Sequence, residues 1–124
     1  MIVGIGVDTV ELARFARALQ RAPRLRERLF TPAERERSLA SLGARFAARE
    51  AAVKALGGIG SLSFLDFEVE SGPAGRPEFA LTPALRAHLA AVGVDHLHLS
   101  LTHERTTATA FVIAERAAPA GSRS

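Results

Sequence analysis

Apolar and polar residues recur along this chain at two different periods, and the change of period divides the chain into two parts. Up to Gly60 the apolar residues recur mainly at spacings of three and four, which is typical of amphipathic helices. After Gly60 they mainly alternate with polar residues, which is typical of half-buried strands. The pattern therefore predicts a domain of mixed helix and strand.

The first part opens with an apolar, glycine-interrupted segment that is typical of a short buried strand, and helical segments follow it. Pro23, Pro32 and Gly43 mark the boundaries between these segments. Gly57 and Gly58 end the last one, because glycine readily takes the left-handed conformation of a helix C-cap. We expect a strand at residues 2–7, helices at 9–19, 24–30 and 31–40, and a central helix within 45–60.

The second part contains turn signals that separate its alternating segments. Residues 71–75, with the sequence SGPAG, predict the turn of a hairpin, and Thr82 followed by Pro83 predicts a helix start. Leu97 and its alternating neighbours predict a strand with one buried face. We expect strands at residues 63–70, 76–81, 95–102 and 106–115, and a helix at residues 82–92.

The central helix carries charged side chains at a fixed spacing. Plotted at 3.6 residues per turn, Phe46 and Val53 share a face, Glu50 and Lys54 lie beside them, and the far side is nearly all alanine. That alanine face can pack closely against another element. Glu50 and Lys54 have the spacing of a solvated ion pair within a helix. Lys54 is the only lysine among many arginines, which favours the alternative of a functional ammonium group.

The composition indicates one globular domain, which we place at residues 1–116, followed by a flexible polar tail at residues 117–124. Hydrophobic residues make up 48% of the 124 residues and charged residues 23%. No apolar run approaches the length of a membrane span, and no signal segment is evident, so we expect a cytoplasmic protein. Because the chain has no cysteine, carboxylates, histidine or water must hold any metal.

Arginines are concentrated in the first half of the chain, although the formal net charge is only +3. A basic flank of this kind attracts an acidic partner, which is either a nucleic acid or an acidic protein surface. A solvated charged helix face is the structural alternative. The chain has no Trp or Tyr, so it offers few stacking platforms for single-stranded nucleic acid. Arg14, Arg17 and Arg21 recur on one stripe of the first helix.

Two further side chains stand at the ends of predicted strands. Asp8 follows the first strand, where its carboxylate suits either a helix N-cap or a metal ligand. Gly4 and Gly6 would let other backbone approach that strand closely. His103 lies at the end of the strand at residues 95–102, where a histidine serves a structural or a chemical role.

Several segments together resemble the holo-[acyl-carrier-protein] synthases, the small 4'-phosphopantetheinyl transferases. The opening GIGVDTVEL at residues 4–12 is similar to the GxGxDxxxx start of that family. RFAAREAAVKA at residues 45–55 resembles its RFAxKEAxxKA block, and LSLTHE at residues 99–104 resembles its SxSHE segment. FTPAE at residues 30–34 and GRP at residues 75–77 also stand where the family has them. The order and spacing of these motifs span nearly the whole chain.

The resemblance implies a fold, a reaction and an assembly. The family fold is of the α/β (α+β) class, an antiparallel sheet packed with helices, and it assembles as a homotrimer with active sites between subunits. The implied reaction transfers 4'-phosphopantetheine from coenzyme A to a serine of apo acyl carrier protein and releases adenosine 3',5'-bisphosphate. Mg²⁺ is the implied metal, fatty acid biosynthesis the implied pathway, and neither nucleic acid nor membrane is an implied partner.

The resemblance also implies roles for single residues. Asp8 and Glu50 would ligate Mg²⁺, in keeping with the one or two carboxylates that this ion usually takes from protein. Lys54 would contact the phosphates, and Glu50 is the candidate general base. Residues at the coenzyme A site would be Arg45, Arg49, Lys54, Gly75, Pro77 and His103. Residues that meet the acidic helix of the carrier protein would be Arg14, Arg21 and Arg24.

The chain departs from the family pattern at two of these positions. Arg49 stands where the family usually has lysine, so we interpret it as either a phosphate contact or a structural contact. Thr102 replaces the second serine of SxSH, which keeps a hydroxyl group and adds a methyl group. From the residues alone, two other functions stay open. They are a basic nucleic-acid-binding module and a metal-dependent phosphohydrolase of nucleotides.

Overall fold

A three-stranded antiparallel sheet forms one layer of the molecule. The computed structural model describes residues 1–118, so the expected tail at 117–124 lies outside the described residues apart from its first two. β1 (Ile2–Glu11) and β4 (His96–His103) are the two edges of the sheet, and β5 (Thr107–Glu115) lies between them. A separate two-stranded sheet pairs β2 (Val69–Ser71) with β3 (Pro77–Phe79). The predicted α+β class with antiparallel pairing is confirmed.

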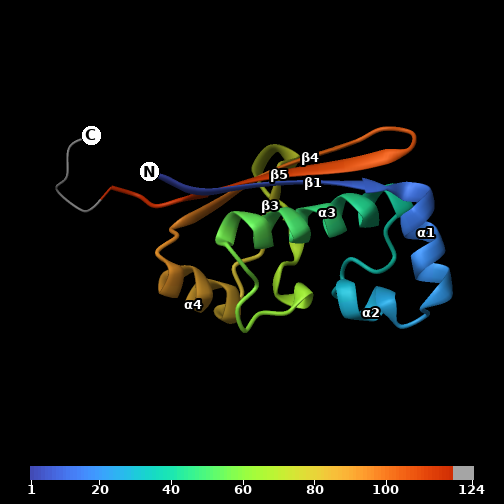
Figure 1. The fold of residues 1–124 in the computed structure, drawn as a ribbon, viewed down its shortest axis with the longest axis horizontal. Coiled ribbons are helices and arrows are strands. Elements are labelled where there is room, and N and C mark those ends of the chain that lie inside the picture. The colour runs from blue at the N-terminus through green and yellow to red at the C-terminus, as the bar shows by residue number, and fades with distance from the viewer. Residues whose placement is uncertain (119–124) are drawn as a thin grey trace.

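The helices form a second layer on one face of the three-stranded sheet, as Figure 1 shows. α3 (Leu39–Leu56) runs along this face, and α4 (Pro83–Val92) lies near one of its ends. α1 (Leu12–Arg21) and α2 (Leu25–Leu29) lie near the other end. Two short 3₁₀ turns, Phe64–Asp66 and Pro73–Gly75, complete the described elements. No helix within residues 1–118 combines the length and the apolar character that a membrane crossing requires.

Contact between α3 and β1 is close enough to involve backbone atoms. A Cβ atom placed on Gly6 would lie 1.8 Å from the carbonyl oxygen of Ala51, and one on Gly4 would lie 1.8 Å from that of Ala55. Both distances are far below a van der Waals contact, so a larger residue at either position would displace the helix. The predictions of a packed alanine face and of close backbone approach at these glycines are confirmed.

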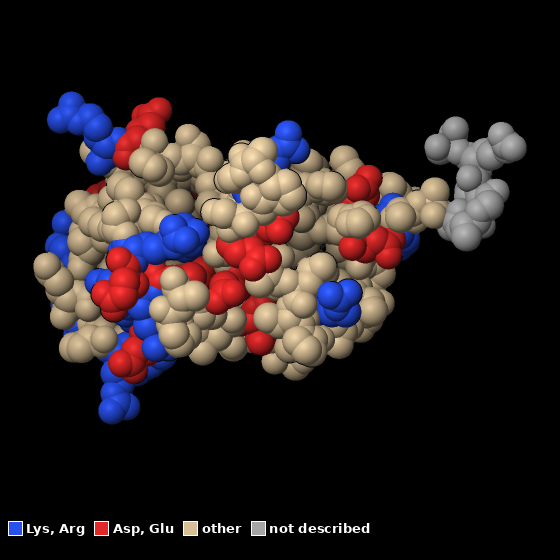
Figure 2. Space-filling model, turned by 180° about the vertical axis from the view of Figure 1, so that it is seen from behind, with Lys and Arg blue, Asp and Glu red and all other residues tan. Residues whose placement is uncertain are grey.

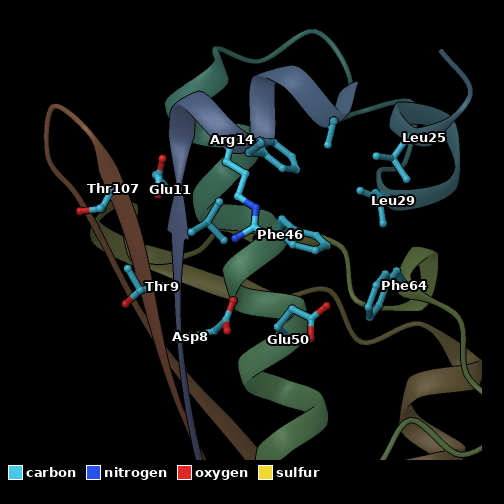
Figure 3. Close-up of a pocket in the computed structure, with 13 residues that line it drawn as sticks. Asp8, Thr9, Glu11, Arg14, Leu25, Leu29, Phe46, Glu50, Phe64 and Thr107 are labelled. Atoms are coloured by element: carbon cyan, nitrogen blue, oxygen red, sulfur yellow. The ribbon is translucent and has the colours of Figure 1, made fainter. Parts of the chain in front are cut away.

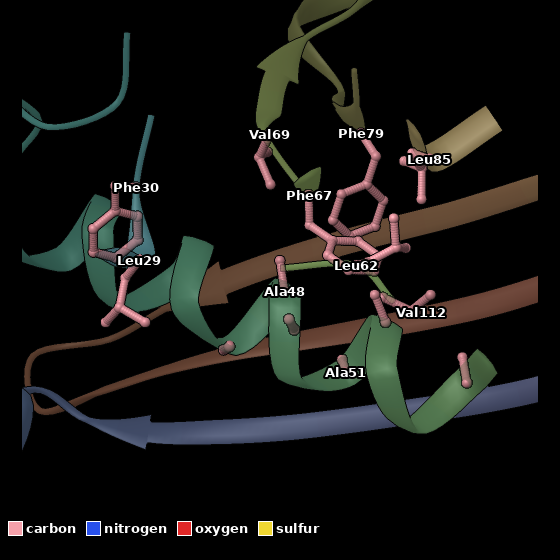
Figure 4. Packing of buried hydrophobic residues seen from close by; sticks show 14 of the residues in the cluster. Leu29, Phe30, Ala48, Ala51, Leu62, Phe67, Val69, Phe79, Leu85 and Val112 are labelled. Atoms are coloured by element: carbon pink, nitrogen blue, oxygen red, sulfur yellow. The ribbon is translucent and has the colours of Figure 1, made fainter. Parts of the chain in front are cut away.

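The hydrophobic core fills the space between α3, the sheet and the segments that return beside it. Phe67 and Phe79 pack edge to face with ring centroids 5.9 Å apart. Leu62, Leu85 and Val112 surround them, and Figure 4 shows this group at the C-terminal half of α3. The two-stranded sheet therefore joins the same core as the large sheet.

The first strand is longer than the sequence pattern predicts. β1 continues to Glu11 because Asp8, Thr9 and Val10 each pair with a residue of β5. α1 starts only at Leu12, so Asp8 lies within the strand and caps no helix. The expected helix start at residue 9 was wrong, because pairing with a distant strand overrides the local helical pattern.

The helix expected at residues 31–40 is also absent from the described chain. Residues 32–36 form turns, and α3 begins instead at Leu39, where the Ser38 hydroxyl accepts a hydrogen bond from the Ser41 amide. Gly43 therefore lies inside α3 and does not separate two helices. There it faces Leu12 and Ala108, where a Cβ atom would lie 2.5 Å from the Leu12 side chain.

The remaining predictions of local structure hold with one exception. The segment at residues 63–70 contains a 3₁₀ turn, with Ser63 and Asp66 forming a capping box, and strand β2 begins only at Val69. Gly57 ends α3 in the left-handed conformation with φ of 77°, as the paired glycines predict. Thr82 caps α4 through a hydrogen bond from the Leu85 amide, again as predicted.

Candidate active site

A cavity of about 810 Å³ opens between β1, α1, α2 and α3. Most of its wall is apolar and consists of side chains from β1, α1, α2, α3 and the 3₁₀ turn Phe64–Asp66, whereas charged side chains stand at one side of it (Figure 3). The apolar lining includes Phe15, Leu25, Leu29, Phe46 and Phe64, and the charged lining consists of Asp8, Glu11, Arg14 and Glu50. A cavity that joins an apolar wall to a few convergent polar groups has the usual form of a ligand site.

Three of the predicted catalytic residues meet at this cavity or beside it. Asp8 points toward α3 because even-numbered positions of β1 face the helix layer. Lys54 extends from α3 and donates hydrogen bonds to the Asp8 carboxylate at 3.3 Å and to the Val7 carbonyl at 3.1 Å. The lysine therefore joins α3 to β1, and it is not simply the solvated partner of Glu50 within the helix. The bridge stays accessible, since the Lys54 side chain is 55% exposed.

Glu50 lies in an environment that disfavours its charged form. Burial raises the pKa of its carboxyl group, the negative charge of Asp8 raises it further, and the positive charge of Lys54 partly opposes both effects. Two carboxylates that repel each other at the edge of a cavity are readily neutralised by a cation between them. The electrostatics of this site therefore suit a bound positive ion.

The oxygen donors at this site fit a Mg²⁺ ion that takes some of its ligands from the protein and the others from water and a substrate. Asp8 and Glu50 supply hard carboxylate oxygens, and Mg²⁺ usually takes one or two carboxylates while water and phosphate oxygens complete its octahedron. Across residues 1–118, no group of three or more His, Asp or Glu side chains is placed to hold a metal ion. A protein site with only two carboxylates matches that mode of Mg²⁺ binding better than a fully protein-ligated metal centre.

The arginines proposed for carrier-protein contact lie at one end of the molecule. Arg14 lines the cavity from α1, and Figure 3 shows its side chain extending toward the space above Asp8. Arg21 ends α1, and Arg24 immediately precedes α2, where both are exposed. Figure 2 shows Lys and Arg side chains gathered at this end, which therefore presents a basic surface beside the cavity mouth.

Arg45 and Arg49, the two arginines of the central motif, are buried. Arg49 has a fully buried side chain and directs both terminal nitrogens at the Glu34 carboxylate, at 3.1 and 2.6 Å. Arg45 lies beside it and donates to the Ser41 hydroxyl. Of the two interpretations of Arg49, the structure favours the structural contact over the phosphate contact.

The other predicted coenzyme A residues lie across the sheet from Asp8. Pro77 joins Leu97 and Leu101 of β4 in lining a second cavity of about 450 Å³, and Gly75 lies in the turn before β3. His103 ends β4. Since β5 separates β4 from β1, one subunit does not bring these residues together with Asp8 and Glu50.

Sequence reasoning missed the partner of Arg49 and most of the cavity wall. The sequence predicts Glu34 only as part of the helix at residues 31–40, yet its carboxylate is buried between α3 and β2. One contact typical of a helix N-cap does form, because the Thr31 amide donates to Glu34 Oε1 at 3.0 Å, but no helix begins there. The position of Glu34 among arginines and apolar residues was the one sign of a buried ion pair. Its partner, Arg49, is 15 residues away in the sequence, so the sequence did not identify it.

The electrostatic coupling between Asp8 and Glu50 can be tested by removing one charge. Asp8→Asn should lower the pKa of Glu50 toward its ordinary value, because it removes the repulsion and frees the Lys54 ammonium to approach Glu50. The measurement is a pH titration of the Glu50 side-chain carboxyl carbon by NMR in metal-free buffer. Glu11→Gln, at the same cavity, is the matched control and should leave that pKa unchanged. An equal shift in both variants would contradict the assigned cause.

Comparison with known proteins agrees with this arrangement. The family model described as the 4'-phosphopantetheinyl transferase superfamily matches residues 4–114. A holo-[acyl-carrier-protein] synthase of Clavibacter michiganensis subsp. michiganensis is 51% identical over 119 residues, which cover 96% of this chain and 100% of that protein.

Solved structures show the same fold. The crystal structure of a holo-[acyl-carrier-protein] synthase from Neisseria meningitidis matches with a TM-score of 0.86 and 36% identity over 94% of this chain and 100% of the other. The Helicobacter pylori enzyme, solved in complex with coenzyme A, matches with a TM-score of 0.78 and 31% identity over 90% and 99% of the two chains. The chain therefore belongs to the holo-[acyl-carrier-protein] synthase family within the 4'-phosphopantetheinyl transferase superfamily.

Proposed function

We propose that this protein transfers 4'-phosphopantetheine from coenzyme A to a serine of apo acyl carrier protein, in a Mg²⁺-dependent reaction that serves fatty acid biosynthesis in the cytoplasm. The observation that carries this proposal is the meeting of Asp8, Glu50 and Lys54 beside an apolar cavity. The names of the relatives support the two substrates, and one of the similar structures holds coenzyme A.

The reaction forms one phosphorus–oxygen bond and breaks another. The serine hydroxyl attacks the phosphate next to pantetheine, and the bond from that phosphorus to the bridging oxygen of the pyrophosphate breaks. Adenosine 3',5'-bisphosphate leaves with that oxygen. Charge accumulates on the phosphate oxygens, so catalysis here depends on positioning and on positive charge. Lys54 is accessible and lies beside Asp8, where its ammonium can contact those oxygens.

Glu50 is the proposed acceptor of the serine proton. Glu50 lines the cavity beside Asp8, where its carboxylate can accept the serine proton directly or through a water. Asp8 and Glu50 would also hold the metal, which when bound supplies positive charge to the pyrophosphate. The apolar wall that includes Phe46 and Phe64 excludes water from one side of these groups.

Intact-mass analysis of an apo acyl carrier protein tests the reaction directly. Incubation with this protein, coenzyme A and Mg²⁺ should add the mass of one phosphopantetheine to the carrier. Glu50→Gln should slow the transfer by a factor on the order of 10² to 10⁴, as expected for loss of a general base. Omission of Mg²⁺ should also abolish the mass gain. Release of phosphate from coenzyme A without any gain by the carrier would instead indicate a phosphohydrolase.

The basic end formed by α1 and α2 is the proposed docking surface for the carrier protein. Arg14 lines the cavity, Arg21 and Arg24 are exposed at the same end of the molecule, and acyl carrier protein is expected to present an acidic helix there. Exposed charges of this kind steer encounter more than they determine final affinity. The reacting serine would then arrive at the side of the cavity where Asp8 and Glu50 lie.

Charge reversal separates docking from coenzyme A binding. Arg21→Glu should lower the apparent affinity for apo carrier protein by about tenfold, the lower end of electrostatic steering effects. Coenzyme A affinity, measured by calorimetry, should not change, because Arg21 does not line the cavity. Arg86→Glu on α4 is the control with the same charge change outside the basic end. Equal losses for both ligands at Arg21 would refute the docking assignment.

The outer face of the sheet supports the proposal of a homotrimer with active sites between subunits. Ile5, Val7 and Phe111 lie on this face and are 56%, 49% and 43% exposed. Val7 and Phe111 are direct cross-strand partners, so these side chains form one apolar surface, and no helix of residues 1–118 covers it. A neighbouring subunit on this surface could bring its own Pro77 and His103 to the Asp8 edge, which one chain alone cannot do.

Phe111→Asp tests the assembly because it places a charge in the middle of the proposed interface. Sedimentation at micromolar concentration should show a trimer for the natural sequence and smaller species for the variant, and transfer activity should fall with the trimer fraction. Leu81→Asp introduces the same charge at a residue that is 54% exposed outside the outer face, and it should leave the mass unchanged. A monomeric natural protein with full activity would contradict both the trimer and the shared site.

A further inference from the structure

The chain buries an ion pair that the proposed reaction does not use directly. Glu34 is 1% exposed and Arg49 is 0% exposed. Burying charged groups costs free energy unless hydrogen bonds and opposite charges compensate them. We therefore ask which segments of the chain this ion pair holds together. Both residues adjoin elements that line the main cavity.

The Glu34 carboxylate connects three segments that are distant in the sequence. Arg49 of α3 donates to both of its oxygens, and the Val69 amide at the start of β2 donates to Oε2 at 3.0 Å. The Thr31 amide, in the turn that carries Glu34, donates to Oε1. Burial alone raises the pKa of Glu34, but the hydrogen bonds and charge of Arg49, with those amides, outweigh it and lower that pKa. The carboxylate is therefore charged and satisfied in the folded protein.

Arg49 is held on its other side as well. Its Nε donates to the Phe64 carbonyl at 2.7 Å, and its guanidinium lies 5.2 Å from the centre of the Phe30 ring. Phe64 itself lines the cavity opposite Glu50. One guanidinium thus fixes α3 to the turn that carries Glu34 and to the 3₁₀ turn that carries Phe64.

α3 gains from such a connection because, apart from Leu42 and the two arginines, its buried residues are glycine and alanine. Ala47, Ala48, Ala51 and Ala52 are fully buried, and their methyl groups set how closely α3 approaches the elements packed against it. These methyl groups restrain sliding and rotation of α3 less than large side chains would, because they interdigitate only shallowly with their neighbours. A two-bond contact between guanidinium and carboxylate has a narrow geometry, so it fixes both. Glu50 is the next residue on the helix, about 100° around its axis from Arg49.

We infer that Glu34 is a positioning residue of the active site, which acts through Arg49 to fix the rotation of α3 that directs Glu50 to the metal beside Asp8. The same contact, through the Phe64 carbonyl, fixes the cavity wall that faces Glu50. The inference rests on the proposed function because it assigns Asp8 and Glu50 to Mg²⁺. It adds that metal affinity depends on a carboxylate that never touches the ion.

Direct measurement of Mg²⁺ binding tests this role. Glu34→Gln keeps the shape of the side chain, removes its charge and replaces one acceptor oxygen by a donor that opposes Arg49. Calorimetric titration of Mg²⁺ in the presence of saturating coenzyme A, well below the unfolding temperature, should show a dissociation constant raised by about 10- to 100-fold. Leu85→Ala is the matched control. It destabilises the core at α4, away from the cavity, and should leave Mg²⁺ affinity unchanged.

A second variant keeps the test decisive if Glu34→Gln does not fold. Glu34→Gln combined with Arg49→Met removes both charges of the pair, so neither is buried without its partner, and it also removes the two-bond contact and the hydrogen bond to the Phe64 carbonyl. It should weaken Mg²⁺ binding as well. Unchanged Mg²⁺ affinity in a folded Glu34→Gln protein, or in the folded double variant, would overturn the positioning role.

The outcomes also separate this inference from the proposed function. If the natural protein modifies the carrier and the variants bind Mg²⁺ normally, only the positioning role fails. If the natural protein binds Mg²⁺ with coenzyme A but modifies no carrier, transfer fails, and the variants still decide the role of Glu34. A natural protein that binds no Mg²⁺ under these conditions would overturn both.

Discussion

The structure depends on the backbone contact between α3 and β1. Gly4 and Gly6 have no Cβ atoms, so the carbonyl groups of Ala51 and Ala55 lie where side chains would otherwise stand. This short separation places a carboxylate of the strand beside a carboxylate of the helix, although 42 residues (50 − 8) separate them in the sequence. Larger residues at the glycines would push the helix away from the strand and would separate Asp8 from Glu50.

Charge has two distinct uses in this chain, and the composition alone does not separate them. Arg49 is fully buried and satisfied by Glu34 and a carbonyl, so it contributes to the architecture. Arg21 and Lys54 are exposed, and they are available to substrates. The fifteen arginines therefore do not form one basic surface. Several of them, such as Arg26 and Arg35, donate hydrogen bonds to backbone carbonyl groups of the protein itself. This division weakens the case for a nucleic-acid interface that the sequence left open.

Local sequence patterns predicted the elements whose ends carry capping residues. They failed where contact with a distant segment of the chain determines the structure. Thr82 with Pro83 and the glycine after α3 act within one turn of helix, so those boundaries could be predicted. β1 extends to Glu11 only because β5, a hundred residues later, pairs with it. Likewise the residues after Thr31 have the pattern of a helix start, but Glu34 turns inward to Arg49. For the site, only the resemblance to the family implied that Asp8, Glu50 and Lys54 act together, and the cavity wall and the Glu34 contact depend on packing between distant segments.

The helices of residues 1–118 form one layer, and that arrangement connects stability with the placement of the site. The helices cover one face of the sheet and leave Val7 and Phe111 exposed on the other, where burial would require another subunit. The sheet order also keeps His103 on the strand opposite to Asp8, so a single chain holds two separated halves of the proposed coenzyme A site. Association through the outer face would cover the apolar surface and join one half from each of two neighbours. The uncovered apolar face of the sheet would thus account both for assembly and for the placement of the active site between subunits.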